Sequence, residues 1–215
     1  MEDGFIVEMV EGHPQLRVCE PFVARFCDRL TACFKGGGKL IIAGNGGSMA
    51  DAQHIAGELS KSFVEQRALS PQQKRTFTGL NNGTTIADNL QNGFPVWVLG
   101  LNAALSSAIL NDFETPYMEF AQELWVAGSS QDLFLGISTS GQAKNVFNAM
   151  VVAKAKGIFA VAFTGQSSNP LCDLADLSIQ VPATETSRVQ EFQQVVYHTF
   201  CKTMEARFFA TPGQG

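Results

Sequence analysis

Charge of either sign is scarce in this 215-residue chain, in which Asp, Glu, Lys and Arg together make up 16% of the residues. Acidic residues outnumber basic ones by 20 to 15, so the formal net charge is -5. No lysine or arginine cluster offers the basic surface that a nucleic acid or an anionic membrane requires. The remaining composition, 45% hydrophobic, is typical of a globular protein that acts on small molecules, and the low charge favours buried subunit interfaces.

Cysteine is also sparse, and no two cysteines have the spacing of a known metal-binding or disulfide motif. The five cysteines are Cys19, Cys27, Cys33, Cys172 and Cys201. No C-x-x-C pair occurs, so neither a zinc knuckle nor a disulfide framework is indicated. The N-terminus lacks a positive region followed by an apolar run, and no segment reaches the roughly 18 apolar residues that a membrane span needs. We therefore expect a protein of the reducing cytoplasm with no membrane segment.

The chain alternates apolar strands with amphipathic helices. We expect strands at 39–43, 94–99, 132–137, 158–163 and 177–181, and helices at about 15–36, 47–64, 103–110, 116–126, 142–156 and 186–208. Residues 65–93 are polar and rich in Gly and Asn, with a short helix at 85–90, which predicts a surface excursion or lid. The alternation predicts one α/β domain over 1–215, a doubly wound sandwich with a five-stranded, mostly parallel sheet. Ligands of such sheets bind at the carboxyl ends of the strands.

The turn Gly44-Asn45-Gly46-Gly47-Ser48 is the first candidate binding loop. It joins the first strand to a helix, and the free amides of a helix N-terminus favour an anion. Tight packing alone is the competing explanation for its glycines. Gly44-x-Gly46 also begins a dinucleotide fingerprint, but Met49 stands at the third glycine position and no Walker lysine follows, so we expect no nucleotide.

A second candidate loop, Ser138-Thr139-Ser140-Gly141, follows the third predicted strand. Three hydroxyls before a helix N-terminus offer side-chain and backbone donors to a phosphate without a fixed positive charge. A helix N-cap would need only one of them. The run of three, with a glycine-rich turn after another strand, favours phosphate binding.

The histidines suggest where a reaction takes place. His54 and Glu58 are four residues apart and share one helical face, while Gln190 and His198 fall at i and i+8 along one ridge of the last helix. A single helical histidine is more often a packed residue than a ligand. If the two helices meet, however, two imidazoles, a carboxylate and an amide could hold zinc or act as a general acid/base pair.

These motifs together resemble the sugar isomerase (SIS) domain family and, within it, the phosphoheptose isomerases. The resemblance covers about residues 15 to 205, and its pieces are Gly-Asn-Gly-Gly-Ser at 44–48, His-Ile-Ala-Gly-Glu-Leu at 54–59, Asn111-Asp112, Ile-Ser-Thr-Ser-Gly at 137–141, Arg-Val-Gln-Glu at 188–191 and His198. It implies isomerisation of sedoheptulose 7-phosphate to D-glycero-D-manno-heptose 7-phosphate through an enediol, for lipopolysaccharide or related surface glycans. It also implies a homotetramer with active sites at subunit contacts.

The resemblance carries roles for individual residues. Ser138, Thr139 and Ser140 would hold the phosphate, and the sugar would contact Asn45, Gly46, Gly47, Asn111, Asp112 and Gln190. Zinc would be held by His54, Glu58, Gln190 and His198, with Glu58 and His198 also acting as the acid/base groups. The metal and hydrogen bonds would stabilise the developing enediolate.

The chain departs from the family pattern in three places. Ala143, with Lys144 beside it, stands where another phosphate-binding serine is usual, and Ser62 stands where an arginine is usual. The excursion at 65–93 is some twenty residues longer than the typical connection. A non-catalytic SIS protein that senses sugar phosphates, or that binds a partner such as the replication initiator, is the alternative. Relatives of the replication-linked kind lack counterparts of Glu58 and His198, which this chain has.

Overall fold

The strand Leu40–Ala43 (β1) is buried along its whole length. Successive side chains of a strand point to opposite faces, and here Leu40 and Ile42 enter one apolar cluster whereas Ile41 and Ala43 enter another. A strand covered on both faces has a continuous apolar sequence, which is why this one could be recognised. The computed structural model describes residues 4–210.

The other strands are Val96–Val98 (β2), Leu133–Ile137 (β3), Phe159–Gly165 (β4) and Leu177–Val181 (β5). Their order in the sheet is β2-β1-β3-β4-β5, and every neighbouring pair is parallel. Within residues 4–210 the predicted five-stranded sheet is therefore confirmed, and it is parallel throughout. The chain reverses its direction of winding at β1, and ligands of such sheets bind at that point.

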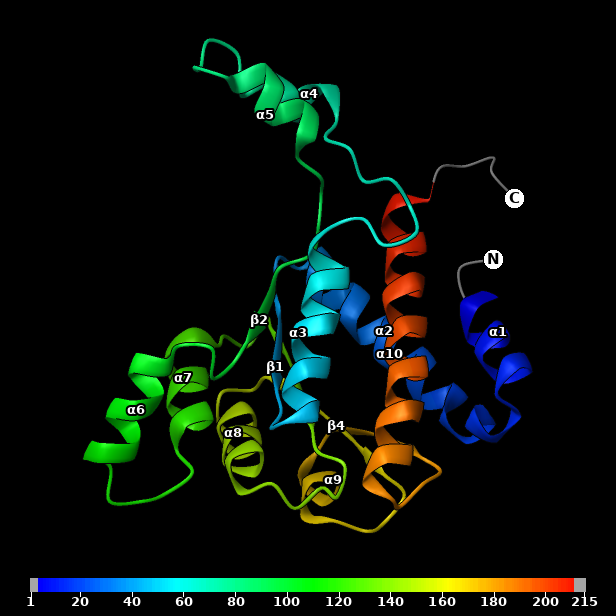
Figure 1. Cartoon of the computed structure of the whole chain (residues 1–215), viewed down its shortest axis with the longest axis vertical. Helices are drawn as coiled ribbons and strands as arrows, with labels where there is room; N and C mark the ends of the chain where they lie inside the picture. The colour runs from blue at the N-terminus through cyan, green and yellow to red at the C-terminus, as the bar shows by residue number, and fades with distance from the viewer. Residues whose placement is uncertain (1–3, 211–215) are drawn as a thin grey trace.

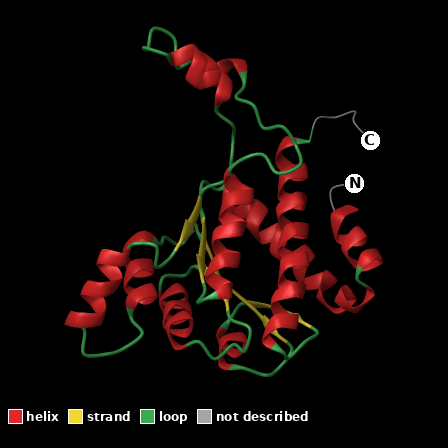
Figure 2. Ribbon diagram, viewed as in Figure 1, coloured by secondary structure: helices red, strands yellow, loops and turns green. Residues whose placement is uncertain are grey.

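Helices cover both faces of the sheet (Figures 1 and 2). One face packs against α2 (Glu20–Lys35), α3 (Gly47–Ser60) and α10 (Thr186–Phe209), and the other against α7 (Glu119–Ala127), α8 (Lys144–Ala155) and α9 (Pro170–Leu174). Outside these layers, α1 (Gly4–Gly12) packs on α10 and α6 (Ala103–Asp112) lies beside α7. Although α10 has 24 residues, it is not apolar enough to cross a bilayer, and no other helix within residues 4–210 is both long and apolar enough to do so.

The N-terminal region differs from the single helix expected at 15–36. A 3-10 turn occupies Pro14–Cys19, and α2 begins only at Glu20. Pro21 lies in the first turn of α2, where its missing N–H costs nothing, so the proline marks a helix start rather than a helix interior. The helix α1, which buries Ile6, Met9 and Val10, was not predicted.

Other boundaries moved by a few residues. The helix expected at 47–64 ends at Ser60, because Lys61 is extended. The helix expected at 103–110 runs on to Asp112, so Asn111 and Asp112 form its last turn rather than a corner after it. The helix expected at 116–126 begins at Glu119, after Tyr117 adopts a left-handed backbone with φ of 64°.

Residues 70–90 form an arm that projects from the rest of the molecule (Figure 1). It contains α4 (Pro71–Arg75), which was not predicted, and α5 (Gly83–Asn89), which corresponds to the helix expected at 85–90. The two segments that lead into and out of the arm pair through an antiparallel bridge between Ala68 and Gln91. No residue of the arm belongs to either apolar cluster that packs on the sheet. The excursion is therefore a surface element, as its composition predicted.

Candidate active site

The helices α3 and α10 run side by side (Figure 1) and bring the predicted reactive side chains together. The Nε2 atom of His54 lies 3.1 Å from Oε1 of Glu58, one turn along α3. The ring of His198 on α10 lies edge-on to that of His54, with 5.0 Å between the centroids. We call His54, Glu58 and His198 the histidine cluster. The sequence could not establish that these helices meet, and the structure supplies that contact.

The environment of the histidine cluster favours proton transfer. Burial, followed by the neighbouring His54, lowers the pKa of His198, so its imidazole is neutral near pH 7 and offers both a donor and an acceptor nitrogen. The second carboxylate oxygen of Glu58, Oε2, is buried and has no hydrogen-bond partner. Leaving a buried acceptor without a hydrogen bond costs free energy of folding. Such unpaired atoms often occur at reactive positions.

Two neighbours of the cluster were not predicted. The hydroxyl of Tyr197 lies 2.9 Å from Nδ1 of His54, so both ring nitrogens of His54 have partners and the ring orientation is fixed. Burial raises the pKa of Asp51, against the lowering effect of a hydrogen bond from Tyr197. Asp51 lies one turn before His54, and this i, i+3 spacing of an acid and a histidine was the available sequence signal.

Gln190 lies nearer the glycine-rich turn than the histidine cluster does. Its side-chain amide packs directly against Gly47, leaving no room for a Cβ atom there. Gln190 and His198 are eight residues apart, about 12 Å along α10. The predicted ridge on α10 thus contacts α3 at two levels, with Gln190 at the start of the helix and His198 opposite His54.

The predicted phosphate loop closes on itself between β3 and α8. Ser138 is buried, and its Oγ accepts a hydrogen bond from the Gly141 N–H at 3.1 Å. Ser140 is exposed, and its Oγ accepts from the Gln142 N–H at 3.3 Å. The helix α8 begins at Lys144, and Ala143 at its N-cap provides no side-chain cap. Within the first turn, Oδ1 of Asn145 accepts from the Val146 N–H at 3.0 Å. The N-cap itself supplies no acceptor, which favours an anion at this end.

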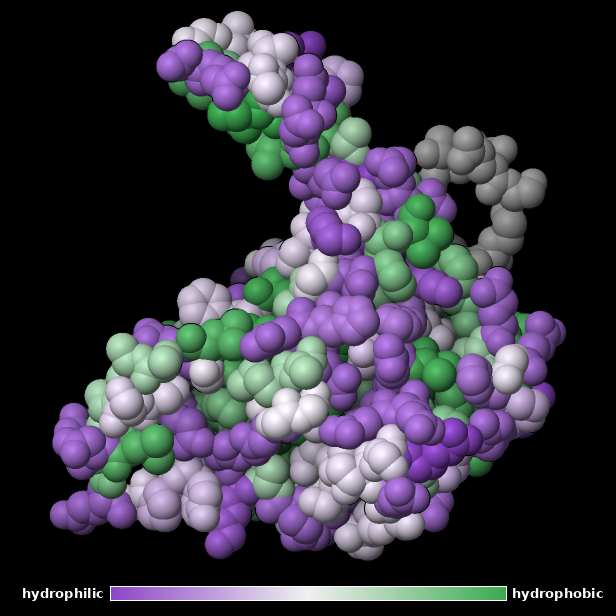
Figure 3. All heavy atoms as spheres, in the orientation of Figure 1, coloured by the Kyte–Doolittle hydropathy of each residue, from purple (hydrophilic) through white to green (hydrophobic). Residues whose placement is uncertain are grey.

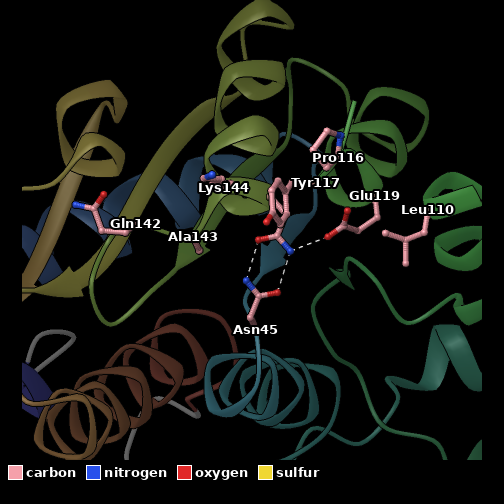
Figure 4. A pocket seen from close by; sticks show the side chains of 9 residues that line it. Asn45, Leu110, Pro116, Tyr117, Glu119, Gln142, Ala143 and Lys144 are labelled. Carbon is pink, nitrogen blue, oxygen red and sulfur yellow. Dashed lines mark hydrogen bonds between the residues drawn. The ribbon is translucent and has the colours of Figure 1, made fainter. Parts of the chain in front are cut away.

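A cavity of about 640 Å³ opens at the carboxyl ends of β1 and β3 (Figure 4). Its polar centre is a pair of amides, in which Asn45 and Asn145 each donate to the other at 2.8 and 2.9 Å. Asn145 also donates to Oε1 of Glu119 at 2.7 Å, while Oε2 of Glu119 is buried without a partner. Lys144 reaches into the cavity over the ring of Tyr117, 5.4 Å from its centroid. Such a set of amides, a carboxylate and a cation suits a hydroxyl-rich anionic ligand.

The predicted site residues fall into separate groups within this chain. Asn45 lines the cavity, and the phosphate loop continues into its lining at Gln142 and Ala143. Asn111 and Asp112 are exposed next to Leu110, another lining residue, and Asn111 donates to Asp112 at 2.9 Å. His54, Glu58, Gln190 and His198 do not line the cavity. Sequence reasoning missed Glu119 and Asn145, although Asn145 lies four residues after the predicted loop.

The donor types of the histidine cluster fit zinc, which binds imidazole and carboxylate ligands. The unpartnered Oε2 of Glu58 is a free acceptor at this position. In the part of the chain that the structure describes, however, no three His, Cys, Asp or Glu side chains are arranged to enclose a metal ion. The residues of the histidine cluster therefore fit a metal by the chemical type of their donor atoms, and not by their arrangement in this structure.

A parallel sheet with a hydroxyl-rich loop after β3 and a histidine cluster at the helix after β1 matches the SIS domain class of protein. The SIS domain family profile matches residues 119–206, from the start of α7 into the last turns of α10. In the structure, the chain resembles the phosphoheptose isomerase of Neisseria gonorrhoeae with a TM-score of 0.72 at 24% identity, covering 93% of this chain and 94% of that one. That likeness supports the fold.

Sequence similarity to curated proteins identifies the family within this class. The chain is 35% identical to the phosphoheptose isomerase of Aneurinibacillus thermoaerophilus over 176 residues, 82% of this chain and 76% of that protein. It is 31% identical to the phosphoheptose isomerase of Geobacter metallireducens over 204 residues, 95% of this chain and 92% of that protein. The chain belongs to the phosphoheptose isomerase family.

Proposed function

We propose that this protein is an aldose–ketose isomerase that converts sedoheptulose 7-phosphate to D-glycero-D-manno-heptose 7-phosphate, a step toward the heptose of lipopolysaccharide or related surface glycans. The observation that carries the proposal is the histidine cluster, in which a carboxylate oxygen without a partner and a neutral imidazole meet at the contact of α3 and α10. Family membership supports the substrate.

In the proposed reaction Glu58 and His198 move protons between neighbouring carbons. The Glu58 carboxylate removes a proton from C1 of the ketose, while the His198 N–H donates to the carbonyl oxygen at C2, giving an enediol. Return of a proton to C2 and loss of the proton from the C1 hydroxyl then yield the aldehyde. No atoms are gained or lost, as an isomerisation requires. His54, fixed by Tyr197 and Glu58, orients the carboxylate.

Zinc is the metal we propose for this site, held by His54, Glu58 and His198 with Gln190 as a fourth donor. When bound, it would stabilise the negative charge that develops on the enediolate oxygens. The four donors are the imidazole, carboxylate and amide groups of two adjacent helices. No other cofactor is required by the proposed reaction.

Substrate binding is assigned to the cavity and the loop beside it. Ser138, Thr139, Ser140 and the N-terminus of α8 would hold the phosphate, and Lys144 adds a positive charge next to the position where Ala143 lacks a hydroxyl. The sugar hydroxyls would contact Asn45, Gly46, Gly47, Asn111, Asp112 and Gln190. Glu119, whose buried Oε2 has no partner, is an added acceptor for a hydroxyl.

We further propose a cytoplasmic homotetramer whose active sites form at subunit contacts. The cavity and the histidine cluster do not share lining residues within one chain, so a second copy would bring them to one substrate. Apolar side chains exposed around β2, α6 and α7 supply the surface for such contacts (Figure 3). They include Trp97, Leu101, Leu110, Trp125 and Val126, which are 47, 57, 70, 57 and 75% exposed.

The deciding experiment incubates the protein with sedoheptulose 7-phosphate and zinc and follows aldose formation, with Glu58→Gln and His198→Asn variants alongside. Each variant replaces one proton-transfer group by an uncharged amide, so we expect kcat to fall by about 10²-fold or more. Turnover that survives both substitutions would refute the catalytic assignment. Activity on a different ketose phosphate would retain the mechanism and change the substrate.

A further inference from the structure

Arg67 and Glu205 form a buried ion pair at the C-terminal end of α3, next to Glu58. The Nε atom of Arg67 donates to Oε1 of Glu205 at 2.8 Å, and the two side chains are 0% and 1% exposed. The guanidinium also lies 5.3 Å from the ring centroid of Phe94 and 5.0 Å from that of Phe209. Removing two charges from water is expensive, and a well-packed apolar pair would often stabilise a fold as well or better. Stability alone therefore does not explain this pair.

The other nitrogens of Arg67 hold the end of the helix that carries Glu58. Nη1 donates to the backbone oxygen of Leu59 at 2.8 Å, and Nη2 donates to the backbone oxygen of Glu58 itself at 3.2 Å. The last carbonyls of a helix have no intrahelical partner and carry partial negative charge, which a cation at this end stabilises. Arg67 thus fixes α3 at the turn from which the proposed base projects.

Glu205 connects the same point to α10. It follows His198 by seven residues, two turns further along the helix. Its Oε1 accepts from the Phe63 N–H at 2.8 Å, and its Oε2 accepts from the Val64 N–H at 2.7 Å. One carboxylate therefore binds both the chain that leaves α3 and the guanidinium that holds the end of α3.

We infer that the Arg67–Glu205 pair is a positioning device that sets Glu58 on α3 against His198 on α10. The inference rests on the proposed function, since it assigns the reaction to these two groups. A guanidinium presents its donors in a rigid planar fork, so it satisfies Glu205, Leu59 and Glu58 simultaneously and in one geometry. A lysine or an apolar pair could fill the space but could not fix the two helices in the same register.

The test uses two variants whose folding is expected to survive. Arg67→Lys keeps the charge next to Glu205 but loses the fork, and the double variant Arg67→Met/Glu205→Leu replaces the ion pair by apolar groups. We expect kcat to fall by about 10 to 10²-fold in both, the range that a displacement of about 1 Å produces, with KM changed less than about 3-fold. Arg29→Lys is the matched control, since Arg29, on α2, lies over the ring of Phe159 at the start of β4.

Thermal unfolding and the imidazole NMR signals of His54 and His198 are recorded on the same samples. The inference predicts that these signals move in both Arg67 variants and stay in place in Arg29→Lys. The double variant should still unfold cooperatively, at a lower temperature than the wild type, because backbone groups from Glu58 to Val64 lose their side-chain partners. Wild-type kcat and unshifted signals in a stable double variant would overturn it, as would a kcat that falls only in proportion to lost folded protein. If the wild type has no isomerase activity but the signals still move, the proposed function fails and the positioning role stands.

Discussion

Among single residues, Asp132 joins two strands at the end of the sheet opposite the candidate site. Its carboxylate accepts from the Lys39 N–H at 2.9 Å, the Lys39 Nζ at 2.7 Å and the Ser129 N–H at 2.7 Å, joining the starts of β1 and β3. Burial would raise the pKa of Asp132, but the hydrogen bonds from Lys39 and Ser129 outweigh it and hold the pKa below its ordinary value.

The pKa of Asp132 predicts a pH-dependent stability. Because the folded-state pKa lies below the unfolded one, the stabilisation is complete above the unfolded value, near pH 4, and is lost as the pH falls through the folded value. We expect Asp132→Asn to reduce the free energy of unfolding by about 1.5–3 kcal/mol at pH 7, with a smaller difference below about pH 4. Denaturant unfolding at pH 7 and pH 3 measures this. A destabilisation that is equal at both pH values would contradict the role given to the charge.

Site residues that belong to a local motif could be predicted from the sequence. Site residues that are placed by contacts between distant parts of the chain could not. His54 and Glu58 share a helical face by spacing alone, and their contact follows from the helix. Asn145 could be assigned only once β1 and β3 were known to be neighbours, because its partner Asn45 is a hundred residues away. In the sequence Tyr197 stands among the apolar residues of the last helix, and only the structure shows that its hydroxyl contacts His54.

Among the helices, α8 has a start that is stabilised from inside its first turn, where Oδ1 of Asn145 accepts from the Val146 N–H at 3.0 Å, and not by its N-cap residue. Ala143 occupies the N-cap with an extended backbone, ψ of 110°, and makes no side-chain cap. A serine there would accept a hydrogen bond from an N–H of the first turn, so we expect Ala143→Ser to stabilise the fold by about 1 kcal/mol. That gain corresponds to a rise in the melting temperature of about 2–4 °C for a protein of this size.

The same substitution tests the phosphate assignment. If the start of α8 lies at the phosphate, the added hydroxyl should also lower KM for the phosphorylated ketose. Calorimetry and steady-state kinetics on Ala143→Ser provide both readouts, and Ala143→Gly, which changes the cap without adding a hydroxyl, is the control. A higher melting temperature with unchanged KM would separate the helix start from substrate binding.

Strands were predicted more reliably than the helices around them. The buried strands have continuous apolar sequences, and β5 spans the five residues expected, Leu177–Val181. Short helices such as α9 have too few residues to show a period. The signals for its start are Asn169, whose side chain accepts from the Cys172 N–H at 2.9 Å, and Pro170 at the first helical position. The end of α3 is set by Arg67, which lies beyond the helix and could not be seen in a local pattern.

At the scale of the whole molecule, the arm at 70–90 has short helices and exposed apolar side chains that call for a partner surface. Its helices have five and seven residues, well below the roughly 12–15 that an isolated helix needs in water. A capping box at Ser70 and an exposed Lys74–Asp88 ion pair hold the arm together. Leu80, Ile86 and Leu90 are 61, 43 and 44% exposed on it, in the apolar surface that Figure 3 shows. The proposed tetramer would give these side chains a partner surface.

Removal of the arm separates its role from that of the sheet. Residues 70–89 are replaced by Asn-Gly, which forms a tight turn between the segments that pair at Ala68 and Gln91. Because the arm adds nothing to the apolar clusters on the sheet, the shortened chain should keep its far-ultraviolet circular dichroism per residue and its cooperative unfolding. If the arm contacts a second copy, light scattering should show a smaller assembly, and the melting temperature should become less sensitive to protein concentration, because fewer subunits dissociate on unfolding. An unchanged assembly would exclude the arm from the subunit contacts and leave the apolar surface around β2, α6 and α7 to carry them.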